Sequence, residues 1–346
     1  MAKVLEILRV AALLAAEMVG GVAVVGVAQE ASRYGFGALF FSIGFSLALV
    51  AGALAHRFVF EPAGTYFVPE AVSRLICRSL ELPSAFLLIA VYVGVLAVEL
   101  AASSSILMKA ADLSRYLSLV VAMAVIAAPA MGGFRATSLW NLGLLLILIL
   151  SLGLCFTKSL DTLTFNFSLP EIRILGMWLV LNPLSFVASQ PLVQSCKWAE
   201  KRGYLITAVF LAAPVVVLVG FLSASVVVAT GACCGRATFA IAAQGLGGAC
   251  GLLAPWAVLV AIVTTAPAVL IGASSLVAYV FKRKGDPSGK DAARSFGIPL
   301  LVMAALLSFC VKSVAMALSY TLSLRALLAL SLIVAAFRRG TCRPCK

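Results

Sequence analysis

Two stretches of the chain decide its fold: LLAAEMVGGVAVVGV at residues 13–27 and LNPLSFVASQPLVQ at residues 181–194. The first interrupts an apolar run with Gly20-Gly21, and the second does so with Asn182-Pro183 and Ser189-Gln190-Pro191. A break in a membrane helix frees backbone carbonyls and amides that lipid cannot satisfy, whereas an ion and a polar solute can. The two stretches therefore predict a buried polar site between two broken helices.

The composition around these stretches is that of a membrane protein. Of the 346 residues, 63% are hydrophobic and 11% are charged, whereas about 25% are charged in an ordinary soluble domain. The balance excludes a cytosolic globular enzyme. The net charge of +13 does not indicate nucleic-acid binding. The basic residues lie mostly in short loops between apolar runs, as membrane topology requires.

The apolar runs predict an all-α integral membrane protein with ten spanning helices, since each span needs about 20 residues. The predicted spans lie near residues 4–28, 34–56, 83–108, 116–132, 136–156, 171–194, 203–229, 252–281, 296–320 and 322–338. Ten such spans occupy nearly the whole chain and predict one membrane transport domain over residues 1–346, without a separate soluble domain.

Basic residues orient these spans. With both termini in the cytoplasm, 18 of the 26 Lys and Arg residues fall in inner segments, as the positive-inside rule requires. The seven assigned to outer segments are Arg33, Lys109, Arg115, Lys158, Arg173, Arg236 and Arg325, and Lys312 falls inside a span. The sequence therefore predicts a multi-pass protein of the cell membrane with cytoplasmic N- and C-termini.

The two breaks occupy the same rank in each half of the chain. Five is odd, so two five-span halves, at 1–156 and 171–338, enter the membrane from opposite sides. Interrupted helices in corresponding positions of two halves are typical of inverted-repeat transporters with a site at the bilayer midplane. Residues 339–346 form a cytoplasmic tail, whose Cys342 and Cys345 we interpret as plain thiols, because no second pair completes a metal site.

Four short strings, in the right order, resemble the sodium:solute symporter family. They are Tyr66-Phe67-Val68-Pro69-Glu70 continuing to Arg74, Gly132-Gly133-Phe134-Arg135-Ala136, Ser189 to Gln194 with Ala199-Glu200-Lys201, and Ala261-Ile262-Val263-Thr264-Thr265. The resemblance implies a leucine-transporter-type fold reduced to its ten-helix core, and secondary transport driven by sodium.

The resemblance also implies an ion site on the first and eighth spans. Carried over residue by residue, it consists of Ala16 and Val19 beside the first break and Ala261, Thr264 and Thr265 on the eighth span. The chemistry agrees, because a sodium ion is a hard cation that needs several oxygen ligands, and a broken helix supplies carbonyls next to a pair of hydroxyls. The alternative is that each threonine bonds only to its own helix.

Six further residues are candidates for contacting the solute. Glu17 and Glu99 are carboxylates inside spans, where an ionisable group is a functional candidate by default. Gln190 and Gln194 share one helix face, and Gly20 and Gly21 form the first break. Each polar candidate also has a structural interpretation: Glu17 paired with Lys312, or the glutamines bonded between helices.

These features predict a sodium-coupled symporter of a small polar organic solute that works by alternating access, with no cofactor besides the coupling ion. Its partners are the solute, sodium and the lipid bilayer, and the oligomeric state stays open. No Walker loop or zinc cluster occurs, and the single histidine, His56, leaves no Ser-His-Asp set, so an enzyme is not expected. Two alternatives remain: proton coupling through Glu17 or Glu99, and a solute sensor that does not transport.

Overall fold

The structure is a computed structural model and is built of helices. It describes residues 2–201, 203–232, 238–282, 289–311 and 314–341. Within these ranges every named element is a helix, and a single isolated β-bridge pairs Gly35 with Phe167. The predicted all-α membrane fold is confirmed. Lys312, Cys342 and Cys345 lie outside the described residues, so the expectations for them stay predictions.

The first break lies where the glycine pair predicts it. Helix α1 (Ala2–Met18) ends before the pair, and α2 (Gly21–Tyr34) begins with its second member. Gly20 between them has a ψ of 174°, an extended value that stops the helical hydrogen-bond pattern. The Val19 amide still donates to the Ala15 carbonyl at 2.9 Å, so the carbonyls freed by the break are those that follow Ala15.

The second break separates two helices that meet at 65°. The incoming segment comprises α8 (Ile172–Gly176), the π-helical turn η4 (Met177–Leu181) and α9 (Asn182–Val187), and α10 (Gln190–Glu200) continues beyond the break. Ser189 is extended, with φ −82° and ψ 108°. Pro191 follows in the first turn of α10, where a missing N–H is tolerated.

The other elements connect and surround these broken helices. Between the breaks lie η1 (Phe36–Ala38), α3 (Leu39–Ala55), η2 (His56–Phe60), α4 (Val68–Leu75), η3 (Arg78–Leu80), α5 (Glu81–Ala110), α6 (Arg115–Ala130) and α7 (Gly133–Ser159). After the second break come α11 (Leu205–Thr230), α12 (Thr238–Gly245), α13 (Gly248–Lys282), α14 (Lys290–Ser308) and α15 (Val314–Thr341).

The border between the last two predicted spans was wrong. The sequence placed it between residues 320 and 322, but α14 already ends at Ser308, and α15 includes residues 314–341. The whole stretch is apolar, and hydropathy alone does not mark a turn within a continuous apolar run. The shift gives the last helix 28 residues.

Seven helices in the described part of the chain are long and apolar enough to cross a membrane, and the bent pair at the second break makes an eighth. The ten predicted spans require two more crossings. The candidates are the α1–α2 pair and the 16-residue α6. Multiple spans are thus confirmed, whereas the number ten remains a prediction.

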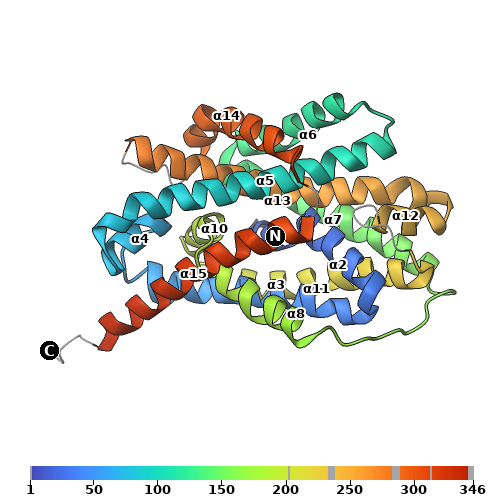
Figure 1. The fold of residues 1–346 in the computed structure, drawn as a ribbon, viewed down its shortest axis with the longest axis horizontal. Coiled ribbons are helices and arrows are strands. Elements are labelled where there is room, and N and C mark those ends of the chain that lie inside the picture. Colours follow the sequence, from blue (N-terminus) through green and yellow to red (C-terminus); the bar gives the residue numbers. More distant parts are fainter. Residues whose placement is uncertain (1, 202, 233–237, 283–288, 312–313, 342–346) are drawn as a thin grey trace.

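Helix α13 runs through the middle of the molecule and packs against α5, α7 and α14 (Figure 1). On the opposite side, α11 packs on α3 and α1, with small residues at the contact. A methyl group at Gly220 of α11, for example, would lie 1.8 Å from the Ser42 hydroxyl oxygen. Helices α1, α10 and α13 also contact one another, which brings both breaks to the centre of α13.

Candidate ion and solute site

The Thr265 side chain on α13 reaches across to the end of α1. Its hydroxyl donates a hydrogen bond to the Ala16 carbonyl at 2.5 Å, although the residues are 249 positions apart. Both residues are buried. The contact joins an oxygen freed by the first break to a hydroxyl on the central helix, as the sequence predicts.

Thr264 and Ala261 add two more oxygens to this group. The Thr264 hydroxyl donates to the Ala261 carbonyl at 2.6 Å, and the Thr265 hydroxyl lies 3.5 Å from the same carbonyl. The bond of Thr264 is the within-helix bond typical of membrane threonines. Thr265 differs, because its shorter bond leaves the helix. We call Ala16, Ala261, Thr264 and Thr265 the oxygen cluster.

Because Gly20 has no side chain, the first break packs directly against Thr265 of the oxygen cluster. A methyl group at this position would lie 2.4 Å from the Thr265 hydroxyl oxygen and 2.8 Å from its β-carbon, so a larger residue requires a displacement. Val19, the remaining predicted ion-site residue, is fully buried beside it. Gly21 opens α2 on the far side of the break.

A cavity of about 50 Å³ adjoins the oxygen cluster. Its walls come from both breaks and from α3, α5, α13 and α15. They consist of Glu17, Met18, Gly20, Phe45, Tyr92, Val95, Glu99, Phe186, Ser189, Pro191, Thr265, Val269 and Arg325. The structure therefore brings three of the predicted solute residues, Glu17, Gly20 and Glu99, to one small cavity beside the predicted ion site.

Glu17 at the end of α1 is hydrogen-bonded to α10 of the second broken helix. Ser195 of α10 donates a hydrogen bond to its carboxylate, and the Glu17 side chain is almost fully buried. Ser195 was not predicted as a site residue. A hydroxyl next to Gln194 on the second broken helix was a weak signal for it, because such serines more often bond within their own helix.

Glu99 lines the same cavity from α5 and is also buried. The nearby serines serve a different purpose. Ser103 donates to the Glu99 backbone carbonyl at 2.7 Å, while Ser104 and Ser105 donate to the Ala101 carbonyl at 3.2 and 2.8 Å. These serine hydroxyls are satisfied inside α5.

Arg325 is the main residue that sequence reasoning missed. The sequence assigned it to an outer segment, but the structure buries it on α15, with 4% of its surface exposed, in the wall of the cavity. The error follows from the misplaced start of α15, which put residue 325 near a helix end. The correction removes Arg325 from the basic residues assigned to outer segments.

Gln190 connects the second break to the segment before α4. Its side-chain oxygen accepts from the Val68 amide at 2.8 Å, and its side-chain amide donates to the Tyr66 carbonyl at 3.0 Å. Its backbone amide donates to the Tyr92 hydroxyl at 2.7 Å. Gln194 is also buried, but its side-chain amide has no hydrogen-bond partner among the described residues. Neither glutamine lines the cavity, and their contact with solute stays a prediction.

We expect Gln190→Ala to destabilise the protein more than Gln194→Ala does. Removing the Gln190 amide leaves the buried Val68 amide without its acceptor, at about 1–3 kcal/mol, and breaks the bond to the Tyr66 carbonyl, whereas Gln194 has no such bonds to lose. Thermal unfolding of the two purified variants measures the difference. Equal melting temperatures would contradict the structural role assigned to Gln190.

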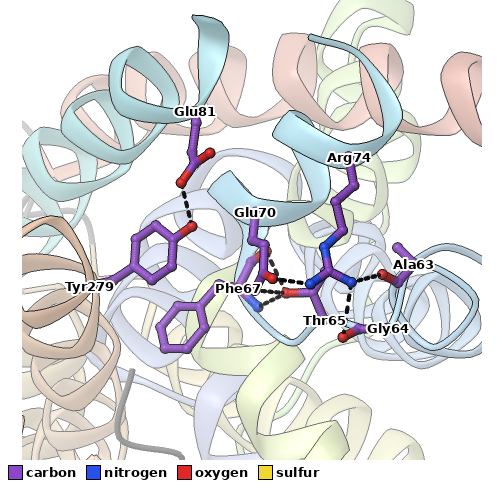
Figure 2. Close-up of polar contacts among 8 residues, drawn as sticks. All are labelled: Ala63, Gly64, Thr65, Phe67, Glu70, Arg74, Glu81 and Tyr279. Atoms are coloured by element: carbon purple, nitrogen blue, oxygen red, sulfur yellow. Dashed lines mark hydrogen bonds and ion pairs between the residues drawn. The ribbon is translucent and has the colours of Figure 1, made fainter. Parts of the chain in front are cut away.

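A polar network fixes the segment that Gln190 contacts (Figure 2). The Thr65 hydroxyl donates to the Glu70 carboxylate at 2.6 Å and accepts from the Phe67 amide at 3.1 Å. Arg74 pairs with Glu70 and donates to the Ala63 carbonyl at 2.7 Å. These bonds hold the start of α4 in one conformation, which positions the Val68 amide for Gln190.

The same segment is anchored to the central helix by aromatic and polar contacts. The Phe67 ring stacks on Tyr279 of α13, with centroids 4.9 Å apart, and the Tyr279 hydroxyl donates to Glu81 of α5 at 2.6 Å (Figure 2). The string at residues 66–74 that carried the family resemblance thus joins α4, α5, α10 and α13. In this structure its role is to position helices, and it lies outside the cavity wall.

No protein-family model and no curated protein sequence matches this chain. A solved structure does: a Na⁺-coupled sialic acid symporter in a substrate-bound, outward-open state aligns with a TM-score of 0.73 at 15% sequence identity. The alignment covers 96% of this chain and 78% of the symporter. The chain has a sodium-symporter-type fold. Its apolar helices are those of a multi-pass membrane protein, while the specific family and the ten-helix core remain predictions.

Proposed function

We propose that the chain is a sodium-coupled secondary transporter that imports a small polar organic solute by alternating access. The observation that carries the proposal is the bond of 2.5 Å between the Thr265 hydroxyl and the Ala16 carbonyl, because it joins the central helix to the first break. Coupling requires an ion whose binding changes the relative position of two helices. An oxygen cluster contributed by both of them meets that requirement.

The oxygen cluster suits sodium in its chemistry. Its members are neutral carbonyls and hydroxyls, all buried, which are the ligands that a dehydrated hard cation prefers. Ala16, Val19, Ala261, Thr264 and Thr265 would hold the ion. Glu17, one residue after Ala16, carries a carboxylate that would offset the ion's charge if it is ionised.

The cavity beside the cluster would hold the solute between the two broken helices. Glu17, Gly20 and Glu99 contribute to its wall, and we place Gly21, Gln190 and Gln194 around it as further candidates. By the distribution of basic residues, both termini face the cytoplasm of a cell membrane. In this arrangement the two breaks, one in each proposed inverted repeat, meet at the midplane.

Uptake into proteoliposomes tests the proposal. A panel of labelled amino acids, carboxylates and sugars is offered with an inward sodium gradient, with an inward potassium gradient, and without a gradient. We expect at least one solute to accumulate only with the sodium gradient. A solute that accumulates equally under all three conditions would contradict sodium coupling.

Proton coupling through Glu17 is the second candidate, favoured by the burial of this carboxylate in the cavity wall. If sodium is the coupling ion, Glu17→Gln retains uptake that depends on the sodium gradient, with weaker sodium affinity. If a proton is the coupling ion, the variant loses all response to a pH gradient. Uptake by wild type, Glu17→Gln and Glu99→Gln under separate sodium and pH gradients distinguishes the two mechanisms.

A further inference from the structure

Arg325 is an unusual residue for the place it occupies. It lies on a membrane-spanning helix, is 96% buried, and forms part of the cavity wall. A guanidinium remains charged at any physiological pH, so it is costly inside a membrane protein unless an anion or several polar groups compensate it. The contacts of the side chain indicate how far that compensation goes.

The protein itself compensates the Arg325 charge only in part. The guanidinium carbon lies 4.7 Å from the centre of the Phe186 ring, a cation–π contact, and the group also lies beside the Tyr92 hydroxyl. Its Nε atom is buried without a hydrogen-bond partner. None of the ion pairs found among the described residues includes Arg325.

Arg325 lines the cavity together with two of its neighbours, Phe186 and Tyr92. Phe186 covers one face of the guanidinium and limits its freedom to turn, and Tyr92 is itself held by the Gln190 amide at 2.7 Å. A guanidinium fixed in this way presents a planar fork of N–H donors. That fork matches the two oxygens of a carboxylate, which can accept two parallel hydrogen bonds.

We propose that Arg325 binds a carboxylate group of the transported solute, which makes the solute a small carboxylic acid or amino acid. The inference rests on the proposed transport function and names its substrate class. The volume of about 50 Å³ favours a short molecule. Glu17 and Glu99 line the same cavity, so their carboxyl oxygens would accept hydrogen bonds from an ammonium group on the solute.

The test measures binding and requires no gradient. Purified protein in nanodiscs is titrated with lactate and alanine, and with their neutral counterparts lactamide and alaninamide, at constant sodium and ionic strength, and its melting temperature is followed. We expect at least one of the two carboxylates to raise the melting temperature and its amide counterpart to bind at least tenfold more weakly. An amide that binds as tightly as its carboxylate, or a wild type that responds to neither acid, would overturn the proposal.

Arg325→Gln and Phe186→Leu form the matched pair of variants. Arg325→Gln removes the charge and is expected to weaken carboxylate binding at least tenfold, whereas Phe186→Leu keeps the charge, removes only the ring that limits the movement of the guanidinium, and is expected to weaken binding less. Arg325→Lys keeps the charge without the fork and should bind with intermediate affinity. If Arg325 only stabilises the helix packing, Arg325→Gln lowers the melting temperature but leaves the affinity unchanged, and the proposal is wrong.

The binding test and the uptake test can fail independently of each other. Binding of a carboxylate that depends on Arg325, with no sodium-driven uptake, would support this inference and contradict sodium coupling. Sodium-driven uptake that is confined to neutral solutes would do the reverse.

Discussion

Thr265→Val is expected to raise the sodium concentration needed for binding by about tenfold to a hundredfold. Valine has nearly the same shape as threonine but lacks the hydroxyl that bonds to the Ala16 carbonyl at 2.5 Å. In the sodium-bound state the ion would have one oxygen ligand fewer. Loss of one buried polar partner costs about 1–3 kcal/mol, and about 1.4 kcal/mol corresponds to a factor of ten in affinity.

The increase in melting temperature with sodium chloride measures this effect without knowledge of the solute, and choline chloride keeps the ionic strength constant. Thr265→Ser is the matched control, because it retains the oxygen, and we expect it to bind sodium almost as wild type does. Thr264→Val is expected to have a smaller effect than Thr265→Val, since the Thr264 hydroxyl bonds only within α13. Equal sodium responses of Thr265→Val and Thr265→Ser would contradict the proposed ion site.

The first break and the hydroxyl pair on α13 could be predicted because their signals are local, whereas their meeting was implied by the family resemblance. Gly20-Gly21 weakens the helix within an apolar run, and the carbonyls freed by a break there are those just before it. Adjacent hydroxyls at Thr264 and Thr265 stand out in an apolar span. The structure brings Ala16 within 2.5 Å of the Thr265 hydroxyl, although whether a sodium ion binds there remains a prediction.

The cavity wall was less predictable because it depends on contacts between distant helices. Gln190 and Gln194 share a face by their spacing, yet the Gln190 side chain bonds to backbone groups more than 120 positions away, at Tyr66 and Val68. Arg325 was missed for a different reason. Its role follows from the start of α15, and the apolar run before it contains no signal for a helix border.

Gly20→Ala is the second variant with a large expected effect: we expect it to abolish the sodium response and to lower the melting temperature. The added methyl group would lie 2.4 Å from the Thr265 hydroxyl oxygen and 2.8 Å from its β-carbon, which forces α1 and α13 apart at the ion site. Overpacking of this kind costs about 1–3 kcal/mol in stability. It also moves the Ala16 carbonyl away from the hydroxyl with which it would share the ion.

Gly143→Ala is the matched control for this substitution. Gly143 lies within α7, and a methyl group there meets no atom within 4 Å, so alanine should stabilise the helix by about 0.5–1 kcal/mol and leave the sodium response intact. The same sodium titration is applied to both variants. Because the two substitutions add the same methyl group, their difference isolates the contact with Thr265. If Gly20→Ala retains a wild-type sodium response, the close approach of the first break to α13 is not required for ion binding, and the coupling mechanism proposed for this chain fails.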